Sequence, residues 1–91
     1  MALLLKTDGT TQQVTPTSGA TFTLQELQGF VGGYIETVRI PIGILIVNEE
    51  GKLMGLAPNP AATGALRAAG MGYDRILGDV LFIEHDSGEI D

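Results

Sequence analysis

Polar residues that could bind a ligand or assist in acid–base chemistry stand at three places in the sequence. Glu36 lies among apolar, strand-forming residues shortly after Gly32-Gly33. Asn59 and Thr63 lie at the start of a predicted alanine-rich helix, and Asp79 lies at the start of a predicted buried strand. Carboxylates accept hydrogen bonds from hydroxyl and amine groups, and the free N–H groups at a helix start can bind an anion. The chemistry that these residues indicate is therefore recognition of a small polar molecule.

Each of these residues also has a purely structural interpretation. Glu36 would be an exposed acid on a half-solvated strand, paired across strands with an arginine. Asn59 and Thr63 would cap the helix, and Asp79 would satisfy a turn. The sequence leaves both interpretations open.

The standard catalytic constellations are missing from the sequence. There is no cysteine, the single histidine is His85, and no serine lies in a nucleophile motif. The glycines at 29, 32 and 33 do not form a dinucleotide-binding fingerprint, and Gly51-Lys52 lacks the remainder of a phosphate-binding loop. We expect no enzyme, no metal and no cofactor, and a hydrolase using Glu36 or Asp79 as general base ranks last among the hypotheses.

Composition limits the class of protein and its partners. A chain of 91 residues, 44% hydrophobic and 18% charged, fits one folded domain over residues 1–91, with residues 84–91 as a polar tail that frays. This apolar content in so small a chain favours a homodimer. The net charge of −6 disfavours direct binding to nucleic acid. The five basic residues are scattered along the chain: Lys6, Arg39, Lys52, Arg67 and Arg75.

The compartment follows from the same composition. The first apolar run, residues 2–5, is too short for a signal peptide or a membrane span, and the lack of cysteine gives no sign of an oxidising compartment. We therefore expect a cytoplasmic protein that does not bind membranes.

The elements that must position these residues can be predicted from turn and cap signals. Asp8-Gly9 predicts a hairpin between residues 2–6 and 10–15. Thr23 and Glu26 form a capping box for a helix that ends at Gly32-Gly33, and Asn59 caps a second helix that continues to residue 70.

Three further strands complete the prediction. They lie within residues 34–40, 43–50 and 75–86, and residues 52–56 form a short strand or an extended connection. Residues 44–47 and 80–83 are apolar on both strand faces, which is typical of central strands. We expect an α+β domain with a mostly antiparallel sheet of about five strands, an N-terminal β-hairpin, and two short helices on one face or at one edge of the sheet.

Three sequence motifs carry a resemblance to a known family. The segments "LQELQGFVGGYIE", "NEEGKLMGLAPNPAAT" and "ILGDVLFI", in this order and spacing, resemble a family of small proteins of unknown function found mainly in bacteriophage genomes and prophages. The similarity covers roughly residues 24–83, and the turn at residues 41–43 is shorter than in that family. The motif positions fall on Gly32, Gly33, Tyr34, Ile35, Glu36, Asn48, Glu49, Gly51, Leu53, Pro58, Asn59, Ala62, Thr63, Gly78 and Asp79.

Two functions remain after these exclusions. The first is a phage accessory protein, acting in counter-defence, that sequesters a small nucleotide-type signal molecule without catalysis. Its predicted pocket is lined by Tyr34, Glu36, Asn48, Asn59, Thr63 and Asp79, with Arg39 or Arg67 available for a phosphate. The alternative is a protein-interaction module that binds a host or phage protein, in which these polar residues are turns and caps.

Overall fold

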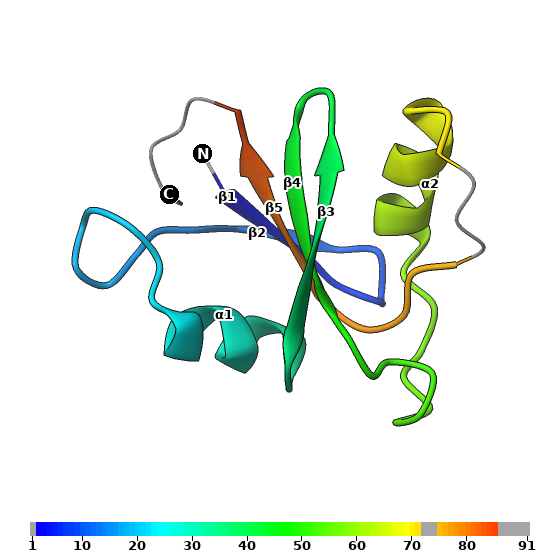
Figure 1. Ribbon diagram of the computed structural model, residues 1–91, viewed down its shortest axis with the longest axis horizontal. Helices are drawn as coiled ribbons and strands as arrows, with labels where there is room; N and C mark the ends of the chain where they lie inside the picture. The colour runs from blue at the N-terminus through cyan, green and yellow to red at the C-terminus, as the bar shows by residue number, and fades with distance from the viewer. Residues whose placement is uncertain (1, 72–74, 86–91) are drawn as a thin grey trace.

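The computed structural model describes residues 2–71 and 75–85, and these form five strands and two helices. Figure 1 shows them in chain order as β1 (Ala2–Leu5), β2 (Thr11–Val14), α1 (Leu24–Val31), β3 (Ile35–Ile40), β4 (Gly43–Asn48), α2 (Pro60–Ala68) and β5 (Val80–Glu84).

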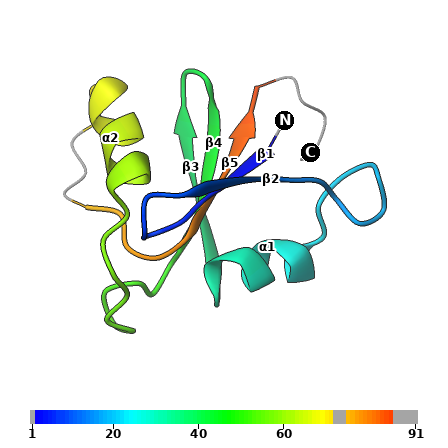
Figure 2. The ribbon, with the colours of Figure 1, turned by 180° about the vertical axis from the view of Figure 1, so that it is seen from behind.

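A single antiparallel sheet contains all five strands, in the order β2-β1-β5-β4-β3. The chain thus forms two hairpins, β1–β2 and β3–β4, and β5 lies between them. The predicted α+β class, the five antiparallel strands, the two helices and the N-terminal hairpin are confirmed. Two edges remain open, one formed by β3 and the other by β2, which faces the viewer in Figure 2.

The two helices cover opposite faces of the sheet, so the prediction that they share one face or edge is wrong. Leu27 and Val31 of α1 pack with Ile44 and Ile46 of β4, together with residues of β1 and β5. Ala62 and Leu66 of α2 pack with Leu45 and Val47 of β4 and with residues of β1, β3 and β5. The physical reason is the apolar run in β4, which is buried at every residue and therefore needs a cover on both sides.

The local signals for α1 are confirmed in detail. Thr23 accepts a hydrogen bond from the N–H of Glu26, and the Glu26 carboxylate accepts one from the N–H of Thr23. Gly32 ends the helix at φ 81°, in the left-handed region where a side chain is unfavourable.

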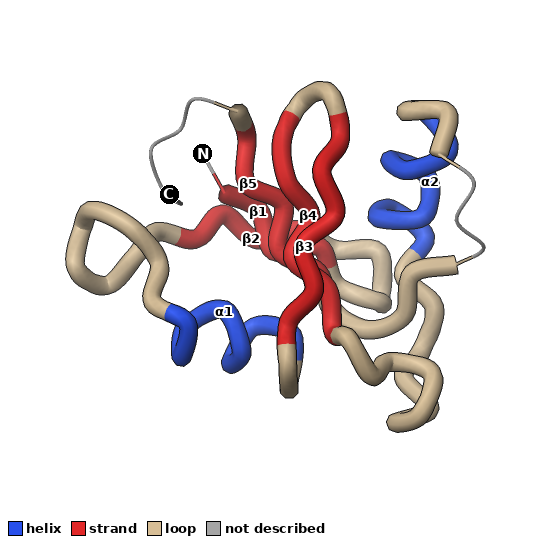
Figure 3. Tube along the Cα trace, in the orientation of Figure 1, coloured by secondary structure: helices blue, strands red, loops and turns tan. Residues whose placement is uncertain are grey.

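Two connections differ from the predicted strands. Residues 49–55 form consecutive turns, shown as the loop after β4 in Figure 3, where a short strand or an extended connection was expected at 52–56. The last strand begins at Val80 and ends at Glu84, and residues 75–79 before it are not part of it. Of the predicted frayed tail, residues 86–91 lie outside the described residues.

Candidate functional site

Asn59 is fully buried, and its side chain is committed to the fold. Its amide nitrogen donates to the carbonyl oxygens of Leu5, at 2.8 Å, and Gly78, at 2.9 Å. Its amide oxygen accepts from the N–H of Ala62 at 3.1 Å, so one of the N–H groups that could have bound an anion at this helix start already has a partner within the protein. All three hydrogen bonds of the Asn59 side chain thus go to backbone groups of the protein itself.

Thr63 and Asn48 are committed in the same way. The Thr63 hydroxyl accepts from the N–H of Ile76 at 3.0 Å. The buried Asn48 side chain donates to the carbonyl of Val31 at 3.0 Å and accepts from the N–H of Glu50 at 2.7 Å. Thr63 thus joins α2 to the segment before β5. Asn48 joins the end of β4 to the end of α1 and also shapes the turn that follows β4.

The remaining predicted residues do not come together. Asp79 accepts from the N–H of Thr7 at 3.0 Å and lines an open hollow of about 330 Å³ beside the C-terminal end of α1. Tyr34 is 64% exposed and lines a separate depression with Met54. Arg39 is exposed and lies an odd number of residues from Glu36 on β3, so its side chain projects from the opposite face. Of the seven predicted residues, Glu36 and Asn48 line one cavity, and the other five lie outside it.

Glu36 lines a cavity of about 190 Å³ on the α2 face of the sheet. The register pairs Glu36 with Val47, and both point toward α2. The cavity lies between β3, β4, the turns after β4, α2 and the segment before β5. Its lining consists of Glu36, Val38, Val47, Asn48, Glu49, Glu50, Gly51, Lys52, Leu53, Leu66, Arg75, Ile76 and Leu77.

The turns after β4 bring three of the charged side chains to this cavity. Asn48 starts the turns by accepting from Glu50, and the N–H of Gly51 donates to the carbonyl of Asn48 at 3.3 Å. Gly51 is buried against Leu77, and a Cβ at this position would lie 3.2 Å from the Cβ of Leu77. The glycine therefore allows the turns to lie against the segment that carries Arg75.

The segment before β5 is held against the start of α2. The N–H of Asn59 donates to the carbonyl of Ile76 at 2.8 Å, and Pro58 forms a β-bridge with Leu77. Together with the bond from Ile76 to Thr63, these contacts fix the backbone next to Arg75.

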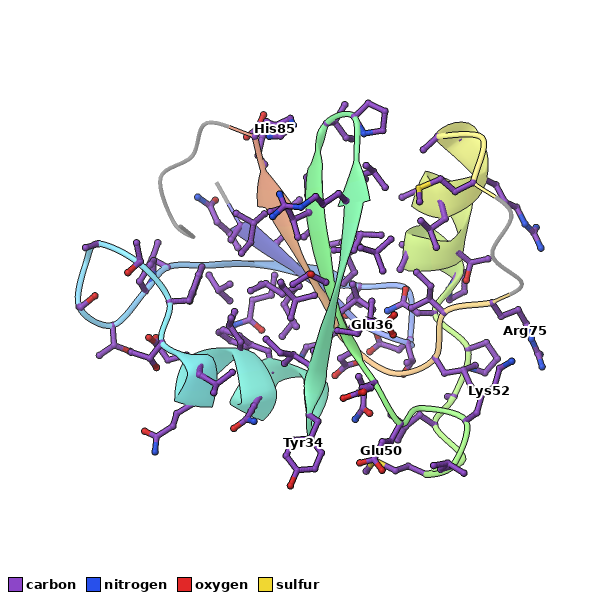
Figure 4. All side chains as sticks on the ribbon, in the orientation of Figure 1. Tyr34, Glu36, Glu50, Lys52, Arg75 and His85 are labelled. Atoms are coloured by element: carbon purple, nitrogen blue, oxygen red, sulfur yellow. The ribbon has the colours of Figure 1, made fainter. Side chains whose placement is uncertain are left out.

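The cavity has an apolar floor and a charged rim. Val38, Val47 and Leu66 are buried and belong to the core on this face. The rim carries the charged residues Glu36, Glu49, Glu50, Lys52 and Arg75. Figure 4 shows Glu36 on the sheet side of the cavity, with Lys52 and Arg75 on the side away from the sheet. None of these five side chains makes a hydrogen bond or an ion pair within the part of the chain that the structure describes.

Lys52 and Arg75 are the residues that sequence reasoning missed. They lie 23 positions apart in the sequence, and nothing in the local pattern around either one predicts that both line one cavity. The one signal in the sequence was that basic residues are rare, because the chain has only five of them. Their convergence depends on the turns after β4 and on the pairing of Pro58 with Leu77.

Comparison with known families covers the whole chain. A family model described as "Domain of unknown function (DUF3846)" matches residues 1–91. The chain belongs to this family. The predicted membership of a family of unknown function is thus confirmed, and the description of the family names no activity. Comparisons of this DUF3846 chain with curated proteins and with solved structures found no match.

Two further findings concern the described residues of the DUF3846 domain. No helix among residues 2–71 and 75–85 is long and apolar enough to cross a membrane. In the same residues, no group of three or more histidine, aspartate or glutamate side chains is placed to hold a metal ion.

Proposed function

We propose that this protein binds a small, nucleotide-type molecule in the cavity beside Glu36 and does so without catalysis. The observation that carries the proposal is the rim of charged side chains that have no partner in the described chain, around an apolar floor. Apolar pockets with a few convergent polar groups are the common form of small-molecule sites.

The charges divide into two sets that suit two parts of such a ligand. Lys52 and Arg75 can hold an anionic group, and arginine in particular can bind a phosphate with two parallel hydrogen bonds. Glu36 can accept from a ribose hydroxyl or a base amine. Arg75 therefore takes the role that the sequence had assigned to Arg39 or Arg67.

The size of the cavity limits how the ligand is held. Its volume of about 190 Å³ lies below the roughly 300–1,000 Å³ typical of sites for drug-sized ligands. A base or sugar would occupy the cavity, and the phosphate would lie at the open rim near Lys52 and Arg75.

The biological role we propose rests on the resemblance described above. In a cytoplasmic phage accessory protein, binding without turnover would lower the concentration of a signal molecule and so act in counter-defence. The proposal that no reaction occurs rests on the lack of a nucleophile, metal or cofactor motif in the sequence.

A second function, binding of another protein, is favoured by exposed apolar residues next to the cavity. Leu53 is 85% exposed and Met54 is 51% exposed, and both lie in the turns after β4. Aromatic residues and methionine are enriched in protein interfaces, and Tyr34 lies in the same depression as Met54.

Ligand binding is tested by thermal shift and calorimetry with a panel of nucleotides and cyclic nucleotides. A ligand that binds only the folded state raises the melting temperature by mass action. We expect at least one compound to do so, and Glu36→Gln and Arg75→Ala each to weaken its binding by tenfold or more. Arg67→Ala is the matched control, because Arg67 is exposed on α2 outside the cavity lining. The proposal is wrong if no compound shifts the melting temperature, or if both cavity variants bind as the wild type does.

A further inference from the structure

The edge strand β3 presents unpaired backbone groups to the outside of the sheet. The carbonyl of Tyr34 accepts from the N–H of Glu49, at 2.9 Å, in register with the β3–β4 pairs. Backbone groups alternate in direction along a strand, so those of the even-numbered residues of β3 point to β4. The N–H and C=O groups of Ile35, Thr37 and Arg39 therefore point outward, where no strand of the described chain lies.

Two charged side chains of opposite sign project from the two faces of this edge. Glu36 lies on the α2 face and Arg39, three positions later, on the other face, and both are exposed. Neither makes a hydrogen bond or an ion pair within the part of the chain that the structure describes. Val38 and Ile40 share the face of Glu36 and are buried there in the core. The edge thus offers an acid and an apolar layer on one face and a base on the other.

We propose that β3 binds an extended segment of another protein as an added antiparallel strand. Along that segment the residues are, in order, an acid opposite Arg39, an apolar residue opposite Val38, any residue opposite Thr37, and a base opposite Glu36. Residues directly opposite each other on an antiparallel pair share a face, and opposite charges there attract. The outward backbone groups of β3 supply the affinity, and the side chains beside them supply the specificity.

The geometry of the added strand suits both charges. Because Thr37 exchanges backbone hydrogen bonds with the segment, Glu36 lies in a non-hydrogen-bonded pair, where opposing side chains are closest. The guanidinium of Arg39 can bind a carboxylate with two parallel hydrogen bonds. An apolar side chain opposite Val38 extends the layer that Val38 and Ile40 form on this face.

The same two charges disfavour a second copy of β3 as the occupant. In an antiparallel pair of two copies the two-fold axis is perpendicular to the sheet, so each face of one copy continues as the same face of the other. In every such register Glu36 and the partner's Arg39 lie on opposite faces and cannot neutralise each other. Charges on an edge strand are a common protection against pairing with an identical strand. A segment with the complementary charges does not meet this barrier.

The opposite edge of the sheet carries no such pattern. β2 consists of Thr11–Val14, and its three exposed side chains are polar and uncharged. Selection of a segment by charge is therefore a property of the β3 edge alone.

This binding surface goes beyond the proposed ligand site, although the two share one residue. Glu36 lines the cavity, whereas Arg39 does not. Variants of Arg39 therefore test segment binding and leave the cavity unchanged.

The first test selects short random peptides from a displayed library against the purified protein, with no nucleotide present. We expect enrichment of the order acid, apolar residue, any residue, base. A synthetic peptide of the enriched sequence is then measured by fluorescence anisotropy, and Arg39→Glu should weaken its binding by tenfold or more. A peptide with arginine in place of its acid should regain binding to Arg39→Glu. Arg67→Glu is the matched control, because it makes the same charge change at an exposed position of α2.

The second test reads the backbone pairing by amide hydrogen exchange. Addition of the peptide should slow exchange of the N–H groups of Ile35, Thr37 and Arg39, which have no partner in the free protein. N-methylation of the peptide residue opposite Thr37 should weaken binding by tenfold or more, because that N–H points to β3. N-methylation of the residue opposite Glu36 is the matched control, because that N–H points away. This pair of peptides needs no protein variant and stays decisive if Arg39→Glu does not fold.

Four outcomes overturn the proposal. They are selection without the expected order, binding that Arg39→Glu leaves unchanged, equal effects of the two N-methyl groups, and bound peptide with no slowing at the three outward N–H groups. Slowing at the same groups as the concentration of the protein alone rises would assign the edge to a second copy and also overturns it. Because no nucleotide is present, these outcomes are separate from success or failure of the nucleotide proposal.

Discussion

Thr23 and Asn59 both cap a helix, and their surroundings differ. At the start of α1, Thr23 and Glu26 bond to each other's N–H groups, and Glu26 also accepts from the N–H of Thr17 at 2.9 Å. All these groups are exposed and lie within ten residues of one another. The α1 cap is therefore a local structure, and water can replace its hydrogen bonds when they break.

The cap of α2 is buried and connects distant parts of the chain. Asn59 joins its own helix to Leu5, 54 residues away, and to Gly78. α1 lies close against β3, β4 and β5, whereas α2 does not come equally close to any strand. The attachment of α2 thus depends more on a few buried polar contacts at its start. The same sequence signature can mark an exposed local cap or a buried link within the fold.

The largest effect is expected for replacement of the buried cap. Asn59→Ala removes the side-chain partner of two carbonyls and one N–H, so we expect a loss of about 4 kcal/mol in the free energy of unfolding, on the scale of roughly 1–3 kcal/mol per unsatisfied buried group. Urea unfolding at one protein concentration measures it. Asn59→Asp keeps the acceptor for Ala62, removes both donors and places a buried carboxylate against two carbonyl oxygens, so its loss should be at least as large. A near-normal stability of Asn59→Asp would show that capping alone matters here, and the contrast with Thr23 would disappear.

Thr63→Val isolates one contact between α2 and the segment before β5. The change keeps the shape of the side chain and removes the acceptor of the Ile76 N–H. We expect a loss of about 1–2 kcal/mol in the free energy of unfolding, because a partly buried donor is left unpaired. Thr37→Val, on the exposed side of β3, is a control with the same chemical change and should have little effect on the unfolding of the subunit.

Thr23→Ala tests the exposed cap in the same assay. We expect a loss of about 1 kcal/mol, the typical value for an N-cap threonine, and clearly less than for Asn59→Ala. If the two losses are equal, burial does not distinguish the caps.

The smallest effect is the pH dependence carried by Glu26. Hydrogen bonds from the N–H groups of Thr23 and Thr17 lower the pKa of Glu26 below its ordinary value of 4.5. Because the folded-state pKa is the lower one, this stabilisation is complete above pH 4.5 and is lost as the pH falls through the folded-state pKa. Glu26→Gln should therefore flatten stability against pH in the acidic range.

Asp8 provides the internal reference for that experiment. Bonds from the Thr10 hydroxyl and N–H lower its pKa in the same direction, from 3.8, so part of the acid sensitivity should remain in Glu26→Gln. An unchanged pH profile in the variant would show that the Glu26 bonds do not persist in solution.

Local signals in the sequence were sufficient to predict the helices and strands. They were insufficient to predict which residues line the candidate site. The caps at Thr23 and Asn59, the Asp8-Gly9 turn and the two-faced burial of β4 all depend on neighbours in the chain, and each was predicted. The assignment of the helices to opposite faces was missed, although the apolar run in β4 already required a cover on both sides.

The candidate residues show why polar type and position do not identify a site. Asn59, Thr63 and Asn48 have the side chains of ligand-binding residues, yet each hydrogen-bonds a distant or turn-forming backbone group. Whether an amide faces a ligand or a carbonyl depends on long-range packing. Arg75 and Lys52 reach the cavity by the same long-range packing, which no local pattern encodes.

The place of β5 between the two hairpins has a consequence for how the chain folds. Neither the β1–β2 hairpin nor the β3–β4 hairpin contacts the other through a strand pair until residues 80–84 insert between them. Most of the sheet's long-range contacts therefore form late and together, a topology that slows folding relative to one built from neighbouring strands. During synthesis on the ribosome, the two hairpins must wait for the last strand to emerge before they can join.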